Sequence, residues 1–189
     1  MGIRLIDDQQ IIDLTCLIAD AFKDKKDKCG YPYIIHCLSV ANYSADLAAT
    51  YFGEQNTSIQ RLAYIVGLCH DCYEDLPSEA IMQVNNLIIK LFPSRALDIG
   101  HYINLLTRRH DQSNEDYLKQ VTKSKIATVV KAADCFHNSL SERYTYLFSS
   151  MNSMEIDKVC SQCITYRARY DRLIELLQQS MTQPVFVEV

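Results

Sequence analysis

Residues 57–71 read TSIQRLAYIVGLCHD, and the spacing of apolar residues in this stretch recurs along most of the chain. Four of its apolar residues follow the i, i+3, i+4, i+7 spacing of one helix face: Ile59, Leu62, Ala63 and Val66. We therefore expect a helix over 57–72 whose buried face continues to Cys69 and His70. Asp71 follows near the expected C-terminus, where the helix dipole disfavours a carboxylate, so a cation should lie beside it.

A second apolar helix, expected over 124–138, also carries an acid on its buried face. Its buried positions are Ile126, Val129, Val130 and Ala133. Asp134 follows on the same face, and Asn138 lies one turn further along. A buried ionised carboxylate costs several kcal/mol unless it is paired or bound to a metal. This helix therefore places a second acid where it needs a positive partner.

The buried histidine and acids suggest a metal site when they are taken together. Singly, His70 reads as a hydrogen-bonded core histidine, and Asp71 or Asp134 as a salt-bridged or helix-end acid. Jointly, and with His36 after a Pro-Tyr turn, they form one constellation of imidazole and carboxylate groups. Such ligands suit Mn²⁺, Fe²⁺, Zn²⁺ or Mg²⁺ better than a soft ion. The pattern predicts one divalent cation and leaves its identity open.

Helical spacing recurs along the rest of the chain, which has five glycines and four prolines in 189 residues. We expect an all-α fold, a single compact domain over 1–189 with about eight or nine helices. Its motif-bearing core spans about 15–145, and a packing helix spans about 154–179. The expected helices are 8–23, 35–52, 57–72, 78–91, 94–106, 113–121, 124–138 and 154–179, with a further one near 140–149.

Composition and charge limit the environments and the binding partners that we expect for the chain. The net charge of −4 argues against a nucleic-acid partner, and no apolar stretch is long enough to span a membrane. The N-terminus MGIRLIDDQQ lacks the layout of a signal peptide, so we expect a cytoplasmic protein. The last helix could pair in a homodimer, which one sequence does not decide.

Eight cysteines are expected to be reduced, with Cys16, Cys37, Cys69 and Cys135 in apolar helical patterns of the core. The pairs Cys69/Cys72 and Cys160/Cys163 leave a four-thiolate zinc site as a minor alternative. His137, next to Asn138, is expected to be a pocket-wall or packing residue rather than an extra metal ligand.

Three motifs resemble those of HD-superfamily phosphohydrolases: Tyr31–His36 (YPYIIH), Gly67–Asp75 (GLCHDCYED) and Val130–Asn138 (VKAADCFHN). Within that superfamily they are most similar to the (p)ppGpp hydrolase domain of RelA/SpoT enzymes and their small stand-alone relatives. The resemblance implies one divalent metal ion, with Mn²⁺ the expected ion. It implies the metal ligands His36, His70, Asp71 and Asp134, the catalytic acids Glu74 and Asp75, and the substrate-binding residue Asn138.

The chain departs from these relatives where substrate is bound. Lys25 and Lys26 align with an Arg-Lys pair whose arginine lies against the guanine base, and lysine lacks the planar guanidinium fork. Ser141 falls where a hydroxyl residue helps to bind the nucleotide, but Leu140 replaces a frequent arginine. Substrate binding is therefore assigned to Lys25, Lys26, Asn138 and Ser141, and guanine selectivity stays open.

The resemblance implies a (p)ppGpp 3′-pyrophosphohydrolase that releases pyrophosphate and GDP or GTP. Because the chain ends near the point where long relatives continue into a synthetase domain, we expect hydrolysis without synthesis. Two alternatives remain. One is an HD phosphohydrolase acting on another small nucleotide, either a monophosphate or a cyclic nucleotide. The other is a non-catalytic helical module that keeps the metal for stability or partner binding.

Overall fold

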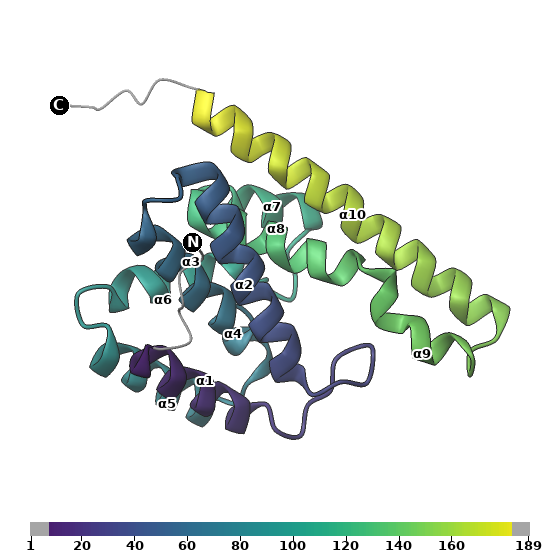
Figure 1. The fold of residues 1–189 in the computed structure, drawn as a ribbon, viewed down its shortest axis with the longest axis horizontal. Helices are drawn as coiled ribbons and strands as arrows, with labels where there is room; N and C mark the ends of the chain where they lie inside the picture. The colour runs from purple at the N-terminus through teal and green to yellow at the C-terminus, as the bar shows by residue number, and fades with distance from the viewer. Residues whose placement is uncertain (1–7, 183–189) are drawn as a thin grey trace.

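The computed structural model describes residues 8–182, and this part of the chain is helical (Figure 1). Its helices are α1 (Gln9–Ala21), α2 (Tyr33–Phe52), α3 (Thr57–Cys69), α4 (Cys72–Asp75), α5 (Ser78–Leu91), α6 (Ala96–Leu106), α7 (Asn114–Val121), α8 (Lys125–Ser139), the 3-10 helix η2 (Ser141–Tyr144), α9 (Thr145–Phe148) and α10 (Ser153–Thr182). The all-α prediction is confirmed. None of the described helices has the length and apolar content needed to cross a bilayer.

Local sequence explains where these helices begin and end. Side-chain oxygens accept hydrogen bonds from backbone N–H groups in the first turns of α1, α3, α7 and α8; the capping residues are Asp8, Asn56, Ser113 and Ser124. α2 is followed directly by Gly53, whose φ of 95° is readily adopted only by glycine. These short polar and glycine signals divide the apolar pattern into separate helices.

The helix expected over 57–72 is interrupted in the structure. α3 ends at Cys69, and α4 starts at Cys72, so Asp71 is the N-cap residue of α4 rather than a late residue of one continuous helix. The expected dipole penalty at Asp71 is therefore wrong. The expected positive partner is present, because the imidazole of His70 lies beside the Asp71 carboxylate. The break between α3 and α4 thus brings the consecutive side chains of His70 and Asp71 into contact with each other.

α2 and α3 approach each other closely at Gly67. A Cβ atom at this position would lie 2.8 Å from Ser44 Oγ and 2.9 Å from Ala41 Cα, closer than side-chain carbons pack. Glycine therefore permits a separation of the two helices that alanine does not. His70 lies one turn after this contact, so Gly67 sets how near α3 carries it to α2.

The C-terminal helix α10 lies along α8 and is drawn in green to yellow in Figure 1. Leu173 is buried in a cluster with Ala132 and Cys135 of α8, and Leu177 is buried in a second cluster with Val129. α10 therefore contributes buried side chains to the core of this chain, and the helix also extends beyond that core. Pairing of this helix in a homodimer stays a prediction.

No disulfide joins the eight cysteines, all of which lie in the described residues. Cys37, Cys69 and Cys135 are buried as expected, but the expectation that Cys16 belongs to the core is wrong, because it is exposed. The buried face of α1 is formed by Ile11, Leu14 and Ile18, and a residue two positions after Leu14 points away from it.

The two C-x-x-C pairs do not come together in one zinc site. Cys69 and Cys72 lie in the main core, whereas Cys163 packs in a separate cluster with Cys29, and Cys160 is exposed.

Candidate metal centre and its cavity

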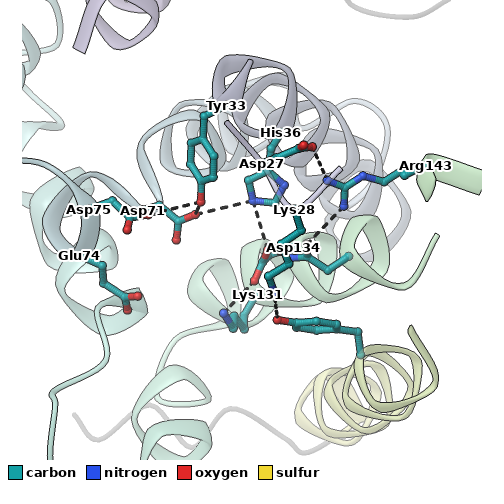
Figure 2. A pocket seen from close by; sticks show the side chains of 12 residues that line it. Asp27, Lys28, Tyr33, His36, Asp71, Glu74, Asp75, Lys131, Asp134 and Arg143 are labelled. Atoms are coloured by element: carbon teal, nitrogen blue, oxygen red, sulfur yellow. Dashed lines mark hydrogen bonds and ion pairs between the residues drawn. The ribbon is translucent and has the colours of Figure 1, made fainter. Parts of the chain in front are cut away.

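Two helices and one helix junction bring the four predicted metal ligands together, and Figure 2 shows three of them, His36, Asp71 and Asp134. His36 lies in the first turn of α2, His70 and Asp71 lie between α3 and α4, and Asp134 lies in α8. Asp71 Oδ2 is 2.9 Å from His70 Nε2 and 3.6 Å from His36 Nε2. Asp134 Oδ1 is 3.5 Å from His36 Nε2 and 3.9 Å from His70 Nε2. All four side chains thus converge from elements far apart in sequence.

His70 has one satisfied and one unsatisfied ring nitrogen. Nδ1 lies 2.8 Å from the backbone oxygen of Gly67 and donates to it. Nε2 is buried and has no hydrogen-bond partner among the described residues, since its 2.9 Å contact with Asp71 Oδ2 lacks hydrogen-bonding geometry. Metal-binding histidines are typically held in this way, with one nitrogen bonded to a carbonyl and the other left for the metal.

His36 is oriented by a second imidazole, that of His137. The two Nδ1 atoms lie 2.8 Å apart, so one donates to the other. Burial, with the positive charge of Arg143, lowers the pKa of His137 to about 3, and His137 is neutral at neutral pH. When Nδ1 of His137 accepts, His36 Nε2 is left with its lone pair directed at Asp71 and Asp134. His137 does not line the cavity but packs behind His36, so of the two expected roles the structure shows the packing role, in which it also orients a predicted ligand.

The spacing of these groups fits one small divalent cation. Metal–ligand bonds of roughly 2.1 Å place neighbouring ligands about 3 to 4 Å apart. The ligand atoms of His36, His70 and Asp71 all lie within 4.8 Å of one another. Asp134 lies 3.5 Å and 3.9 Å from the two histidine nitrogens. The donor set of imidazole and carboxylate groups suits a hard or borderline ion and does not single one out.

Asp134 is held in its ionised form by neighbours in its own helix. Lys131 Nζ lies 2.8 Å from Oδ2, and Asn138 Nδ2 donates to Oδ1 at 2.6 Å. Burial acts to raise the pKa of Asp134, but the positive charge of Lys131 and the two histidines outweigh it and hold the pKa below its usual value. Asn138, expected to bind substrate, therefore also positions this carboxylate.

Asp71 receives a hydrogen bond from Tyr33, whose hydroxyl donates to Oδ2 at 2.5 Å. Burial acts to raise the pKa of Asp71, but the neighbouring His70 and His36 hold it well below its usual range. Burial and the Asp71 charge raise the pKa of Tyr33, so its hydroxyl stays protonated and remains a donor. The Asp71 carboxylate is thus held in place by Tyr33 and by the two histidines.

The predicted catalytic acids lie at the rim of the same site. Burial of the Glu74 carboxyl raises its pKa, although the backbone N–H of Arg108 donates to Oε1 and opposes the shift. Asp75 forms an ion pair with Lys25 and accepts a 3.3 Å hydrogen bond from Tyr33. Over the whole residue Glu74 and Asp75 are both exposed, in contrast to the buried histidines, and only the carboxyl group of Glu74 is partly removed from water.

These side chains line a cavity of about 230 Å³. It is bounded by Asp27, Lys28, Tyr33, His36, Asp71, Glu74, Asp75, Lys131, Asp134, Asn138, Arg143 and Tyr166. Carboxylates outnumber cationic side chains in this lining. The cavity therefore favours a bound cation and needs that cation before it favours an anionic substrate.

The predicted substrate-binding residues are distributed unevenly around this cavity. Asn138 lines it, and Lys25 reaches its edge through Asp75. Lys26 and Ser141 are exposed and are not part of the lining, so their substrate role stays a prediction.

Several lining residues were missed by sequence reasoning. Tyr33 and Lys131 stand in the quoted motifs, but the sequence does not show that Tyr33 donates to Asp71 or that Lys131 pairs with Asp134. Asp27 and Arg143 form an ion pair at 2.6 Å across 116 residues of sequence. No local pattern reveals such a pair.

The model of the HD domain family matches residues 33–139, more than half of the chain. The chain therefore belongs to the HD domain family. No curated protein matches it. Membership implies a metal-dependent phosphohydrolase, and His36, His70 and Asp71 are able to bind the metal.

Proposed function

We propose that this HD-family protein is a (p)ppGpp-type 3′-pyrophosphohydrolase that releases pyrophosphate and leaves GDP or GTP. The observation that carries the proposal is the placement of Glu74 and Asp75. Both acids line the same cavity as His36 and Asp71, two members of the His36, His70 and Asp71 cluster. The Glu-Asp pair directly after the metal-binding His-Asp pair is the feature most similar to the alarmone hydrolases.

In this proposal His36, His70, Asp71 and Asp134 hold one divalent cation, with Mn²⁺ the first ion to test. Such a cation polarises a phosphoryl oxygen and lowers the pKa of water at the site. The protein contributes the fixed ligand geometry. His137, Tyr33 and Asn138 each hold one ligand in place through hydrogen bonds.

Glu74 and Asp75 orient the attacking water and move its proton. A carboxyl group with a raised pKa, as at Glu74, exchanges protons more readily near neutral pH than an ordinary carboxylate. Asp75 is tied to Lys25 and Tyr33, which fixes its orientation. We therefore assign proton transfer to Glu74 and positioning of the water to Asp75.

A second candidate is an HD phosphohydrolase that acts on another nucleotide. The ion pair between Lys25 and Asp75 favours it, because the residue aligned with the guanine-contacting arginine is already engaged by a carboxylate. Lys26 is exposed outside the cavity lining. Neither residue provides a planar fork for a guanine base.

The test is manganese-dependent release of pyrophosphate from ppGpp, measured beside a guanosine monophosphate and a cyclic nucleotide. The variant Glu74→Gln/Asp75→Asn should lose roughly 10²- to 10⁴-fold in rate while keeping its metal. The matched control is Glu115→Gln/Asp116→Asn, an adjacent exposed Glu-Asp pair in the first turn of α7, which should keep full activity.

The outcomes separate the candidates. Full activity of the Glu74/Asp75 variant would remove the assigned catalytic acids. Turnover of another nucleotide without ppGpp hydrolysis would favour the second candidate. A protein that binds metal and turns over none of these esters would favour the non-catalytic module.

A further inference from the structure

A second cavity, of about 500 Å³, adjoins the metal cavity on the side of α10. It is lined by Lys28, Lys158, Ser161, Gln162, Thr165, Tyr166 and Arg169. Two of these residues, Lys28 and Tyr166, also line the metal cavity. We call this second cavity the cationic groove. The shared residues place the cationic groove directly beside the metal cavity.

The groove has a charge opposite to that of the metal cavity. Its ionisable lining consists of three cations and a tyrosine, without a carboxylate: Lys28, Lys158, Arg169 and Tyr166. In a chain with a net charge of −4, this is a local concentration of positive charge. Of its remaining polar side chains, Ser161 and Gln162 can donate hydrogen bonds, whereas the Thr165 hydroxyl already donates to the backbone oxygen of Ser161 at 2.9 Å.

The cations of the two cavities also differ in their partners. In the metal cavity, Lys131 pairs with Asp134 at 2.8 Å and Arg143 pairs with Asp27 at 2.6 Å. In the described part of the chain, Lys28, Lys158 and Arg169 form no ion pair with a carboxylate. The groove cations are therefore available to neutralise an anion from outside the protein.

The groove is assembled by a loop that is anchored to the metal side. Asp27, next to Lys28, accepts hydrogen bonds from the backbone N–H groups of Cys29 and Tyr31 and pairs with Arg143. Lys28 Nζ donates to Tyr166 Oη at 2.7 Å and lies 4.8 Å from the centre of its ring.

Arg169, which like Tyr166 lies in α10, contacts the Tyr166 ring, with its guanidinium carbon 5.7 Å from the ring centre. Lys158, Gln162, Thr165 and Arg169 follow one face of α10. The loop and this helix face thus form the two walls of the groove.

We propose that the cationic groove binds a second phosphate group of the substrate while the first lies at the metal centre. This inference rests on the proposed phosphohydrolase function and narrows its substrate class. The preferred substrates carry phosphate groups at two separate positions of one small molecule. Lys28 lies at the junction of the two cavities, and Lys158 and Arg169 contact the distal phosphate.

The experiment measures binding of inorganic pyrophosphate to the full chain by calorimetry in the presence of EDTA. Without a divalent ion the acidic metal cavity repels this anion, so binding reports on the groove. Wild type should bind, and Lys158→Ala/Arg169→Ala should bind at least tenfold more weakly, since the variant loses two charge-assisted hydrogen bonds to the anion. Raising the salt concentration should weaken wild-type binding.

The matched control is Arg167→Ala/Arg172→Ala, which removes two charges from the same helix. These arginines pair with Asp171 and Glu175 and do not line the groove. Pyrophosphate affinity should be unchanged in this variant. Equal binding by wild type and Lys158→Ala/Arg169→Ala, or an absence of wild-type binding, would overturn the proposal.

The binding assay does not depend on turnover, which separates this inference from the proposed function. Pyrophosphate binding that requires Lys158 and Arg169, in a protein that does not hydrolyse ppGpp, would support the groove and reject the alarmone assignment. Hydrolysis of ppGpp by a protein in which the groove variant does not change pyrophosphate binding would support the alarmone assignment and reject the groove.

Discussion

The metal centre and the cationic groove adjoin each other but are built in different ways. The metal ligands come from packed helices, and His36, His70 and Asp134 are 3%, 2% and 5% exposed. The groove is formed by a loop and the outer face of α10, where Lys28 and Lys158 are exposed. Packing holds the buried ligands in place before a cation binds, whereas exposed lysines lose side-chain freedom only when a ligand orders them.

Under the proposed roles, the metal centre carries out the chemistry and the groove selects the substrate. Changes in the metal centre should affect cation binding and every reaction that depends on it. Changes in the groove should affect which anion binds and leave the cation in place. Three predictions test this separation, beginning with the largest expected effect.

Asp71→Asn should have the largest effect, because it removes the negative charge that contacts both histidines. Metal affinity and phosphohydrolase activity should each fall by more than the 10- to 100-fold typical of losing a residue that only supports a ligand. Metal content by atomic spectroscopy and manganese-dependent turnover provide the measurements.

Asp98→Asn is the matched surface control, since Asp98 pairs with Arg95 far from the site. Lys158→Ala should retain its metal if the two regions are separate. Loss of metal from Lys158→Ala, or retention of full affinity in Asp71→Asn, would contradict the comparison.

Metal affinity should rise with pH by up to tenfold per unit between pH 6 and about 9. Burial acts to lower the pKa of His70, but the adjacent Asp71 and Asp134 carboxylates outweigh it and raise the pKa to about 9. A metal ion must therefore displace a proton from His70 below that pH. Competition with a fluorescent chelator across this range measures the slope.

The metal-free protein should show the opposite trend in stability. Because the folded pKa of His70 lies above its ordinary value of 6.5, the protonated imidazole stabilises the fold fully below pH 6.5. That contribution, on the order of 3 kcal/mol, is lost as the pH rises through about 9. Thermal unfolding in EDTA measures it. A pH-independent metal affinity together with a flat stability profile would contradict this account of His70.

Gly67→Ala should have the smallest of the three effects. The new Cβ would meet Ala41 Cα and Ser44 Oγ at less than 3.0 Å, so α2 and α3 must move apart. We expect the free energy of unfolding to fall by about 1 to 3 kcal/mol, with weaker metal binding because His36 and His70 separate.

Gly100→Ala is the matched control for Gly67→Ala. At Gly100 the nearest atom to an added Cβ is Tyr73 Oη at 3.8 Å, an ordinary contact. In a helix interior this change should be neutral or stabilising by up to about 1 kcal/mol. Denaturant unfolding of both variants tests whether close packing of α2 on α3 supports the metal centre. Equal stability of the two variants would count against that role.

The helical fold could be predicted from sequence because the apolar spacing is nearly continuous. Helices expected at 57–72, 124–138 and 154–179 are found at Thr57–Cys69, Lys125–Ser139 and Ser153–Thr182. The main error was the break at His70 and Asp71. Apolar spacing continues through it, so the pattern alone does not reveal that the chain turns there.

The sequence by itself determined the fold class and the residues able to form a metal centre. Periodicity places His70 and Asp134 on buried faces, and a buried charge or imidazole requires a partner. The position of His36 after a Pro-Tyr turn joined it to them, and the resemblance to HD phosphohydrolases added the acids Glu74 and Asp75.

Only the tertiary structure decided how those residues are supported and what lies beside them. His36 meets His137 across 101 residues, and Lys28 meets Tyr166 across 138 residues. Such contacts depend on how whole helices pack against one another. Helical periodicity identifies the buried face of a helix, but it does not identify the helix against which that face packs. The motif-bearing helices therefore carry the residues of the metal centre, while the cationic groove forms only where the loop after α1 meets the helix α10.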